Sequence, residues 1–326
     1  MRSRRLTRNL GINRRLASVA NGVLGAVTEN TFQALGCVLT GMMAFACAPA
    51  GAVSPLSADS GETLIAAGDI AQCGRSGYVG TGAEATARLI ERMPGTVLAL
   101  GDLAYPNGAE REFRECYDPT WGRFKDRTRP APGNHDYNTP SATPYYAYWG
   151  EQAGASGEGF YSFELGAWHI IALNSNIRKG PLASRQEQWL AADLEGHPAG
   201  CALAFFHHPR FSSGGHGDDP RLDPLWRILH SHGVDVVLGG HDHDYERFAP
   251  LDPDGRRDMQ RGIREFVVGT GGAALTPFLL IRPYSEVRIN GAHGVLRMTL
   301  WPGSYRWEFL SAPGERLLDT GSGSCH

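Results

Sequence analysis

The 326-residue chain has few cysteines, no long apolar run and no basic run beyond its first residues. It has six Cys, and no CxxC pair occurs among the four beyond residue 52, so a zinc–thiolate site is not expected. An apolar stretch at residues 34–46 is too short to cross a bilayer as a helix. What remains is an ordinary globular composition, 42% hydrophobic and 20% charged, that can bury one large core.

The first 52 residues are typical of an export signal. Several Arg precede the apolar run Ala34–Ala46, and small residues follow it up to Ala52, where we expect cleavage. Ser3-Arg4-Arg5 and Asn13-Arg14-Arg15 each resemble the twin-arginine export pattern, so this route is one alternative. The rest of the chain is therefore expected to be secreted or periplasmic.

The chain beyond the signal is acidic. Residues 1–52 carry six Arg and one Glu, so their removal changes the formal charge from −3 to −8. Because an acidic domain without basic runs binds polyanions poorly, nucleic acid is not expected as a bulk partner. We expect a short linker at 53–61 and a single domain at 62–326 that ends in a hairpin and a tail. No stable membrane span is expected after cleavage, and the oligomeric state is left open.

An even number of cysteines remains after cleavage. Two disulfides are expected in an exported chain, and three connectivities are open. The four residues are Cys73, Cys116, Cys201 and Cys325. Cys325, the penultimate residue, would attach the tail to the domain.

Two apolar runs in the first half each end in Gly-Asp. Thr63–Asp69 and Thr96–Asp102 are typical of buried strands, and the apolar spacing of Ala83–Met93 between them predicts a helix. The two Asp are 33 residues apart, the length of one β-α-β unit, so a right-handed crossover would bring both carboxylates to one sheet edge. Asn134 lies 32 residues further on and predicts a third strand ending there.

The second half repeats this rhythm of strands and helices. A capping box at Ser184–Glu187 predicts a helix through Leu194. The other predicted elements are strands at Trp168–Asn174, Cys201–Phe206, Val234–Gly240 and Arg264–Val268, a helix at Leu222–His232, and a hairpin of Val295–Trp301 with Tyr305–Leu310 turning at Pro302-Gly303. Helices early and hairpins late favour two packed mixed sheets with helices outside.

Five short blocks contain residues that commonly bind metals. They are Gly68-Asp69, Gly101-Asp102-Leu103-Ala104-Tyr105, Gly133-Asn134-His135-Asp136, Phe206-His207-His208-Pro209 and Gly240-His241-Asp242-His243. Hydrolysis of an anionic phosphoester is helped by two cations about 3.5–4 Å apart that neutralise the phosphate and acidify a water. Carboxylate, phenolate, amide and imidazole ligands would offset the repulsion between two such cations.

These blocks, in this order, resemble the metallophosphoesterase (calcineurin-like phosphoesterase) superfamily, and Tyr105 within GDLAY resembles its purple acid phosphatase branch. The resemblance implies an α/β fold, a four-layer αββα sandwich. It also implies a first metal held by Asp69, Asp102, Tyr105 and His243, and a second held by Asp102, Asn134, His207 and His241. Fe(III) paired with Zn, Mn or Fe(II) is implied, since a phenolate suits a trivalent iron. No accessory β domain is expected before the first strand.

Three further residues are candidates for catalysis. By resemblance His135 interacts with substrate or nucleophile, Asp136 is expected to orient its imidazole, and His216 on a Gly-rich loop is expected to bind phosphate or protonate the leaving oxygen. The predicted activity is hydrolysis of small phosphate monoesters by attack of a metal-bound hydroxide. One alternative is a phosphodiesterase or nucleotidase with the same site. Another is a non-catalytic surface protein that binds metal or phosphate.

Other polar residues have simpler interpretations. His208, next to a predicted ligand on a strand, should point to the opposite face as a structural residue. Arg247 is expected to form a salt bridge that holds its loop. The histidines outside the motifs, interpreted as surface or helix-end residues, are His169, His197, His230, His232 and His293. A dinuclear β-lactamase-type hydrolase is excluded because its HxHxDH cluster is absent.

Overall fold

The computed structural model describes residues 61–326 apart from 75–76, 79–80 and 199. The export signal expected at 1–52 and nearly all of the linker expected at 53–61 lie outside the described residues. Within the described ranges, no helix is both long enough and apolar enough to span a bilayer.

Three sheets form in the described part of the chain. The first has the order β16-β15-β14-β1-β4-β6, the second β13-β11-β12-β10-β9-β8-β7, and the third β3-β2-β5. The strands of the first sheet are β1 Glu62–Ala67, β4 Thr96–Leu100, β6 Thr128–Ala131, β14 His293–Trp301, β15 Ser304–Ala312 and β16 Arg316–Ser324. Those of the second are β7 Tyr161–Leu165, β8 Trp168–Ala172, β9 Ala202–Phe205, β10 Val236–Gly239, β11 Tyr245–Phe248, β12 Arg264–Val268 and β13 Ser285–Ile289. The small sheet contains β2 Ala71–Gly74, β3 Gly77–Tyr78 and β5 Ala104–Tyr105.

Helices flank the two large sheets. The α-helices are α1 Thr81–Ile90, α2 Glu110–Glu112, α3 Thr143–Trp149, α4 Pro181–Gly196 and α5 Asp223–Ser231. Shorter 3-10 and π turns are Phe113–Tyr117, Trp121–Arg127, Asp136–Asn138, Pro140–Ala142, Gly150–Ala153 and Pro220–Leu222.

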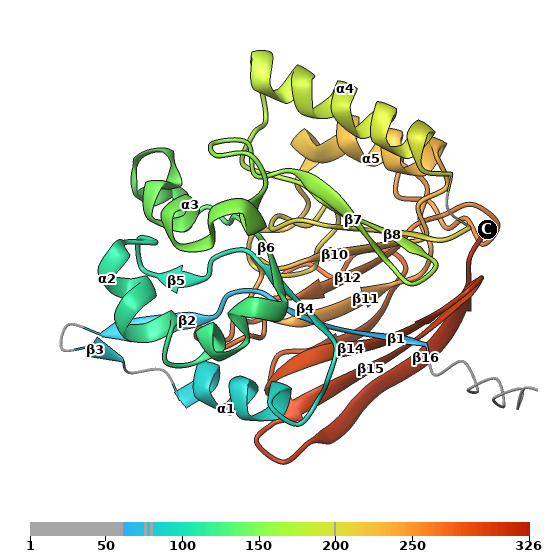
Figure 1. Ribbon diagram of the computed structural model, residues 1–326. Helices are drawn as coiled ribbons and strands as arrows, with labels where there is room; N and C mark the ends of the chain where they lie inside the picture. Colours follow the sequence, from blue (N-terminus) through green and yellow to red (C-terminus); the bar gives the residue numbers. More distant parts are fainter. Residues whose placement is uncertain (1–60, 75–76, 79–80, 199) are drawn as a thin grey trace, which may run out of the picture. The chain divides into compact units, whose positions relative to one another are not determined.

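Helix α1 packs against the first sheet, and α4 and α5 cover the second, so the two sheets lie face to face between helices (Figure 1). Alternation along β9 shows how both faces of the second sheet are buried: Leu203 and Phe205 join the large core cluster, whereas Ala204 joins the cluster beneath α4 and α5. The predicted four-layer sandwich of two mixed sheets is confirmed.

The parallel strands that were expected to carry the Gly-Asp pairs are neighbours. β1 pairs with β4 and β4 pairs with β6, in parallel in both cases, and α1 connects the first two. In the second sheet β8, β9, β10 and β12 are parallel neighbours. Since parallel strands end at one edge, the residues after β1, β4, β6, β9 and β10 come together there.

One prediction about local structure was wrong. Helix α4 begins at Pro181 after Gly180, so the capping box at Ser184–Glu187 lies inside the helix. Proline suits this first position because its missing N–H would have no helical acceptor there. The tail expected after the hairpin contains a further strand, because residues 316–324 form β16, which pairs antiparallel with β15.

Two disulfides select one of the three open connectivities. Cys73 is bonded to Cys116, which joins the small sheet to the turn at Phe113–Tyr117. Cys201 is bonded to Cys325, which joins the start of β9 in the second sheet to the end of β16 in the first. The second bond closes a separation of 124 residues, for which chain entropy predicts a stabilisation of about 4–5 kcal/mol.

A buried carboxylate also connects the two sheets. Asp319 on β16 accepts hydrogen bonds from Tyr245 Oη at 2.7 Å, Arg247 Nε at 2.8 Å and Trp307 Nε1 at 3.0 Å. Arg247 also pairs with Glu286, as expected for a residue with a structural role. Burial raises the pKa of Asp319, but the Arg247 guanidinium and the hydrogen bonds from Tyr245 and Trp307 outweigh it and lower the pKa below its usual range.

We predict that Asp319→Asn lowers the free energy of unfolding by about 3 kcal/mol at pH 7, because it leaves the buried side of Arg247 without its charge partner. A carboxyl group with a depressed pKa in the folded state stabilises the fold above its unfolded pKa and loses this effect as pH falls. The difference between variant and wild type should therefore shrink below about pH 4. Urea unfolding at several pH values measures both effects.

Asp254→Asn serves as the control for this prediction. Asp254 also pairs with an arginine, Arg227, but both side chains are about half exposed. Its substitution should leave the unfolding midpoint unchanged. An equal loss in both variants, or a loss in Asp319→Asn that does not depend on pH, would contradict the role given to Asp319.

Candidate metal centre

Seven candidate ligands come together where strands of both large sheets end. Asp69, Asp102 and Asn134 follow β1, β4 and β6 of the first sheet, and Tyr105 lies on β5. The three imidazoles come from the second sheet: His207 follows β9, His241 follows β10, and His243 precedes β11. Strand ends therefore bring oxygen donors from one sheet opposite nitrogen donors from the other.

The hydroxyl of Tyr105 is the centre of one half of the cluster. Its oxygen lies 2.7 Å from Asp69 Oδ1, 3.1 Å from Asp102 Oδ2 and 3.0 Å from His243 Nε2. His243 Nε2 is also 3.3 Å from Asp69 Oδ1. The four residues that the resemblance assigns to a first metal thus meet around the Tyr105 hydroxyl.

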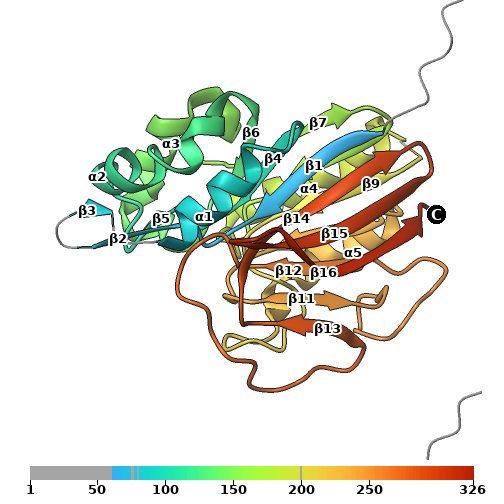
Figure 2. The same cartoon turned by 90° about the horizontal axis from the view of Figure 1, so that it is seen from below.

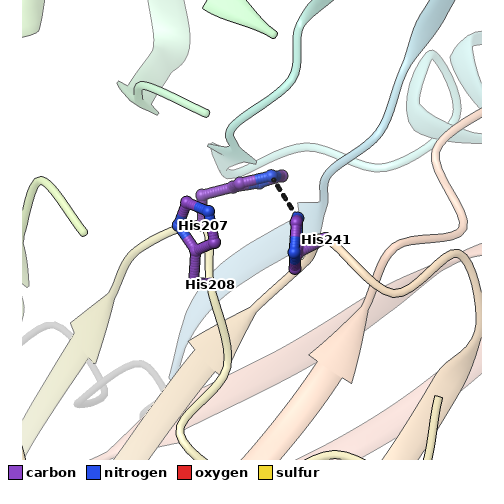
Figure 3. A group of neighbouring side chains, drawn as sticks. All are labelled: His207, His208 and His241. Atoms are coloured by element: carbon purple, nitrogen blue, oxygen red, sulfur yellow. Dashed lines mark hydrogen bonds between the residues drawn. The ribbon is translucent and has the colours of Figure 1, made fainter. Parts of the chain in front are cut away.

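His207 is the centre of the other half. Its Nε2 lies 3.1 Å from Asn134 Oδ1, 3.3 Å from Asp102 Oδ2 and 3.3 Å from His241 Nδ1. Figure 3 shows the rings of His207 and His241 turned toward each other. Asp102 Oδ2 contacts both Tyr105 and His207, so this one carboxylate oxygen joins the two halves.

Backbone carbonyls orient two of the imidazoles. His207 Nδ1 donates to Leu100 O at 2.9 Å and His243 Nδ1 donates to Ala274 O at 2.7 Å. With Nδ1 occupied in this way, Nε2 of each ring is left to face the cluster as an acceptor or a ligand. A fixed tautomer of this kind is typical of metal-binding histidines.

Three of the candidate ligands have a backbone conformation that L-residues seldom adopt. The φ angles are 60° at Asp69, 51° at Asp102 and 71° at His241. Such residues persist only where the surrounding structure holds them, and they are concentrated at functional sites. Here amides bind the strained carboxylates: His241 N donates to Asp69 Oδ2 at 2.8 Å, and His135 N to Asp102 Oδ1 at 2.7 Å.

The electrostatics of the cluster are dominated by burial. Burial raises the pKa of Asp102, but the charge and hydrogen bond of His207 outweigh it and lower that pKa to about 2. Burial lowers the pKa of His207, and Asp102 in turn raises it to about 9. Burial and the carboxylates of Asp69 and Asp102 raise the pKa of Tyr105 well above its usual range. Asp102 and His207 thus pair with each other, and a cation bound at the cluster would take the place of the imidazole proton.

The donor set suits two cations. One half offers carboxylate and phenol oxygens with one imidazole, and the other offers an amide oxygen with two imidazoles, sharing Asp102. Hard oxygen donors favour a trivalent or hard ion, whereas imidazole suits zinc, iron and similar divalent ions. The arrangement can therefore hold a pair of metal ions side by side.

Comparison with known proteins agrees with this geometry. The profile of the family described as Calcineurin-like phosphoesterase matches residues 61–245, a stretch that includes all seven candidate ligands. The chain belongs to the calcineurin-like phosphoesterase family. This family implies a binuclear metal centre for the phosphoesterase domain.

The relatives of this phosphoesterase point to the purple acid phosphatase branch, as expected. Human acid phosphatase type 7 is 27% identical over 250 residues, 64% of this chain and 56% of the relative. Purple acid phosphatase 15 of Arabidopsis thaliana is 28% identical over 222 residues, 55% of this chain and 41% of the relative. The chain thus spans about half the length of these curated relatives.

Solved structures show the same fold. Purple acid phosphatase PPD1 from yellow lupin seeds superposes with a TM-score of 0.65 at 20% identity, over 81% of this chain and 53% of that one. GAP50, described as the anchor in the inner membrane complex of Plasmodium, superposes with a TM-score of 0.61 at 15% identity. The match covers 81% of this chain and 89% of GAP50. At these identities the likeness concerns the fold alone.

His135 lies beside the cluster, but Asp136 does not orient its ring, so that prediction was wrong. His135 Nδ1 donates to Pro106 O at 2.7 Å, so this carbonyl holds the ring, and its Nε2 lies 3.9 Å from Asp102 Oδ2. The ring packs on Tyr105 with centroids 4.5 Å apart. Asp136 instead turns inward and accepts the Gly133 amide at 2.8 Å, because the GNHD segment curls into a tight turn.

The Gly-rich loop brings His216 to the cluster. Its ring lies over that of His241 with centroids 4.0 Å apart, and its Nδ1 lies 3.0 Å from Asp242 Oδ1. The same carboxylate oxygen accepts the His216 amide at 2.8 Å, and its Oδ2 accepts Ser212 Oγ at 2.5 Å. Asp242 was missed from the sequence, although its place between two candidate ligands in GHDH was an available signal.

Two other histidines differ from expectation. His208 does not point away from the cluster: it lies beyond the end of β9, where strand alternation no longer applies, and its ring is 4.4 Å from that of His241 (Figure 3). Its Nδ1 is hydrogen-bonded to Ser175 Oγ at 2.8 Å. His169 is buried between Glu164 and Asp193 beneath α4, with its two ring nitrogens 2.7 and 2.8 Å from their oxygens.

The remaining histidines are closer to expectation. His197 and His232 follow the ends of α4 and α5, and His230 lies in the last turn of α5. His293 begins β14, half-buried, with Nε2 2.9 Å from Ala273 O.

We predict that Gly133→Ala lowers metal affinity by about 10–100-fold, the range found when a ligand loses its support. A Cβ at Gly133 would lie 2.1 Å from Asp102 Oδ1 and 2.2 Å from Asp102 N, so the shared carboxylate must move. Calorimetric titration with zinc measures the affinity, and circular dichroism checks the fold.

Gly196→Ala, at the end of α4, is the matched control, since no heavy atom lies within 4 Å of a Cβ there. It should bind metal as the wild type does. If Gly133→Ala bound zinc with the affinity of the wild type, the observed position of the Asp102 carboxylate would not be required for metal binding.

Proposed function

We propose that this protein is an exported binuclear-metal phosphohydrolase that hydrolyses phosphate monoesters. One observation carries the proposal: donor atoms of seven side chains converge around Asp102 and Tyr105 at separations of 2.7–3.3 Å. Family membership and the acid phosphatases among its relatives support the reaction class.

In this proposal the two halves of the cluster hold one ion each. The residues of the first ion are Asp69, Asp102, Tyr105 and His243, and those of the second are Asp102, Asn134, His207 and His241. Bound there, the two cations would neutralise the phosphate, acidify a water and align the attacking and leaving oxygens. The phenol of Tyr105 favours Fe(III) in the first position, with Zn, Mn or Fe(II) in the second.

Protein groups beside the cluster complete the site. His216 is held through Nδ1 by Asp242, which leaves Nε2 to face the substrate. Hydrogen bonding to Asp242 raises the pKa of His216, so the ring can carry a proton for the oxygen released when the P–O bond breaks. His135, packed on Tyr105, would bind a phosphate oxygen. Asp136 contributes indirectly, by holding the turn that carries Asn134.

Two disulfides support a location outside the cytoplasm, because such bonds persist in oxidising compartments. The expected signal at 1–52, with the twin-arginine route as one alternative, belongs to this part of the proposal. A secreted or periplasmic protein of acidic charge would act on small phosphate esters available there. The complete set of seven candidate ligands favours an enzyme over a binding protein that has lost catalysis.

We predict that Asp102→Ala lowers hydrolysis of an aryl phosphate monoester by about a thousandfold, since a metal pair contributes several kcal/mol to the transition state. Asp126→Ala, which removes an exposed carboxylate, is the control and should retain activity. Rates on mono- and bis-aryl phosphates are measured for both proteins. Unchanged activity in folded, metal-loaded Asp102→Ala would refute the proposal, and a faster wild-type rate on the diester would favour the phosphodiesterase alternative.

The Tyr105→Phe variant tests the metal assignment separately. We predict that the purified protein contains iron and absorbs visible light through a tyrosinate-to-iron transition, and that this band disappears in the variant. Elemental analysis accompanies the spectrum. A colourless, active, iron-free wild type would remove iron from the proposal and leave a pair of divalent ions.

A further inference from the structure

Exposed apolar side chains are concentrated in one segment of the described chain. In the whole described part of the chain, six large apolar residues are clearly exposed. Four of these six lie within residues 279–284. They are Leu279 at 69%, Leu280 at 62%, Ile281 at 52% and Tyr284 at 46%. Exposed apolar residues concentrated in one segment mark a binding site more often than singly scattered ones do.

The segment belongs to the long connection that leaves β12 and reaches β13, the edge strand of the second sheet (Figure 2). We call residues 276–284 the apolar rim. Its first residue is attached to a candidate ligand, because Thr276 N donates to His243 O at 3.0 Å, two residues after Ala274 O accepts His243 Nδ1. The rim therefore begins at the metal cluster.

The middle of the apolar rim is attached to the loop that carries His216. Leu279 N donates to Ser213 O at 3.0 Å, and Arg282 N donates to Ser213 Oγ at 2.9 Å. Arg282 Nε pairs with Asp218 at 3.0 Å, and a Cβ added to Gly217 would lie 3.4 Å from Arg282 Nη2. The rim thus contacts residues 213–218, the loop that carries His216.

Backbone attachments and proline keep this segment ordered while its apolar side chains stay in water. Pro277 and Pro283 restrict φ on both sides of Leu279–Ile281. Ala249 N donates to Tyr284 O at 2.9 Å, and this hydrogen bond holds the C-terminal end of the apolar rim. A preorganised apolar surface can bind a ligand without a large entropic cost of ordering.

We propose that the apolar rim binds the apolar part of the leaving group, so that the preferred substrates are monoesters of long alkyl or aryl alcohols. This inference rests on the proposed function, in which His216 faces the oxygen of the leaving group. Because residues 279–282 are hydrogen-bonded to the loop that carries His216, an organic group attached to an oxygen beside His216 can extend onto the apolar rim. The phosphate itself stays on the polar cluster.

The test compares wild type with Leu279→Ser/Leu280→Ser/Ile281→Ser on ethyl phosphate and on octyl phosphate below its micellar concentration. We expect the wild type to have a higher kcat/KM for octyl phosphate than for ethyl phosphate. The kcat/KM of the variant for octyl phosphate should be about tenfold lower than that of the wild type, mainly through a higher KM, because each buried CH₂ contributes to binding. The variant should stay within about twofold of wild type on ethyl phosphate.

Met259→Ser/Leu317→Ser is the matched control, because these two side chains are 61% and 48% exposed outside the rim. It should keep the wild-type preference for octyl phosphate. Equal wild-type rates on both esters, or an unchanged preference in the rim variant, would overturn the proposal.

Two further measurements distinguish a failure of the rim proposal from a failure of the proposed function. If the metal-loaded wild type hydrolyses no ester, the proposed function fails, and calorimetric titration with octyl- and methylphosphonate then tests the rim by binding alone. The rim proposal is supported if the wild type binds octylphosphonate more tightly than methylphosphonate and the rim variant loses this difference. Equal affinity of the wild type for the two phosphonates would overturn the proposal. If the rim variant loses binding to phosphatidylcholine vesicles but keeps the octyl preference, the rim binds lipid surfaces and the proposal is wrong.

Discussion

The site depends on two buried carboxylates held against one phenol. Asp69 and Asp102 are almost fully buried, and both contact the Tyr105 hydroxyl. Two such charges repel each other and are costly to desolvate, so each needs donors around it. Amides of His241 and His135 supply part of this compensation, and imidazoles supply more. Carboxylate, phenol and imidazole donors gathered at this distance are what make the cluster a place for cations.

Holding these carboxylates in left-handed backbone conformations requires a rigid surrounding fold. The parallel strands of two sheets provide it, because their buried faces interlock over a large core and their ends cannot move independently. Strand β16 joins the two sheets through Asp319 and through Cys325, which is bonded to Cys201. The strain at the site is thus supported by packing and cross-links elsewhere.

Local sequence was sufficient where spacing and strand geometry agree. The 33-residue interval between Asp69 and Asp102 equals one crossover unit, and β1 and β4 are indeed parallel neighbours. It was insufficient where a residue's direction depends on a loop. His208 was assigned by strand alternation, yet β9 has already ended, and Asp136 turns toward Gly133 because its segment curls back.

By itself, then, the sequence determined the family, the two mixed sheets and the list of candidate ligands, because these follow from short motifs and from the period of buried strands. Only the tertiary structure decided which cysteines pair, that the tail is a strand, that Asp242 supports His216, and that an apolar segment borders the cluster. Those features depend on contacts between residues far apart in the chain, and such contacts leave no local pattern in the sequence.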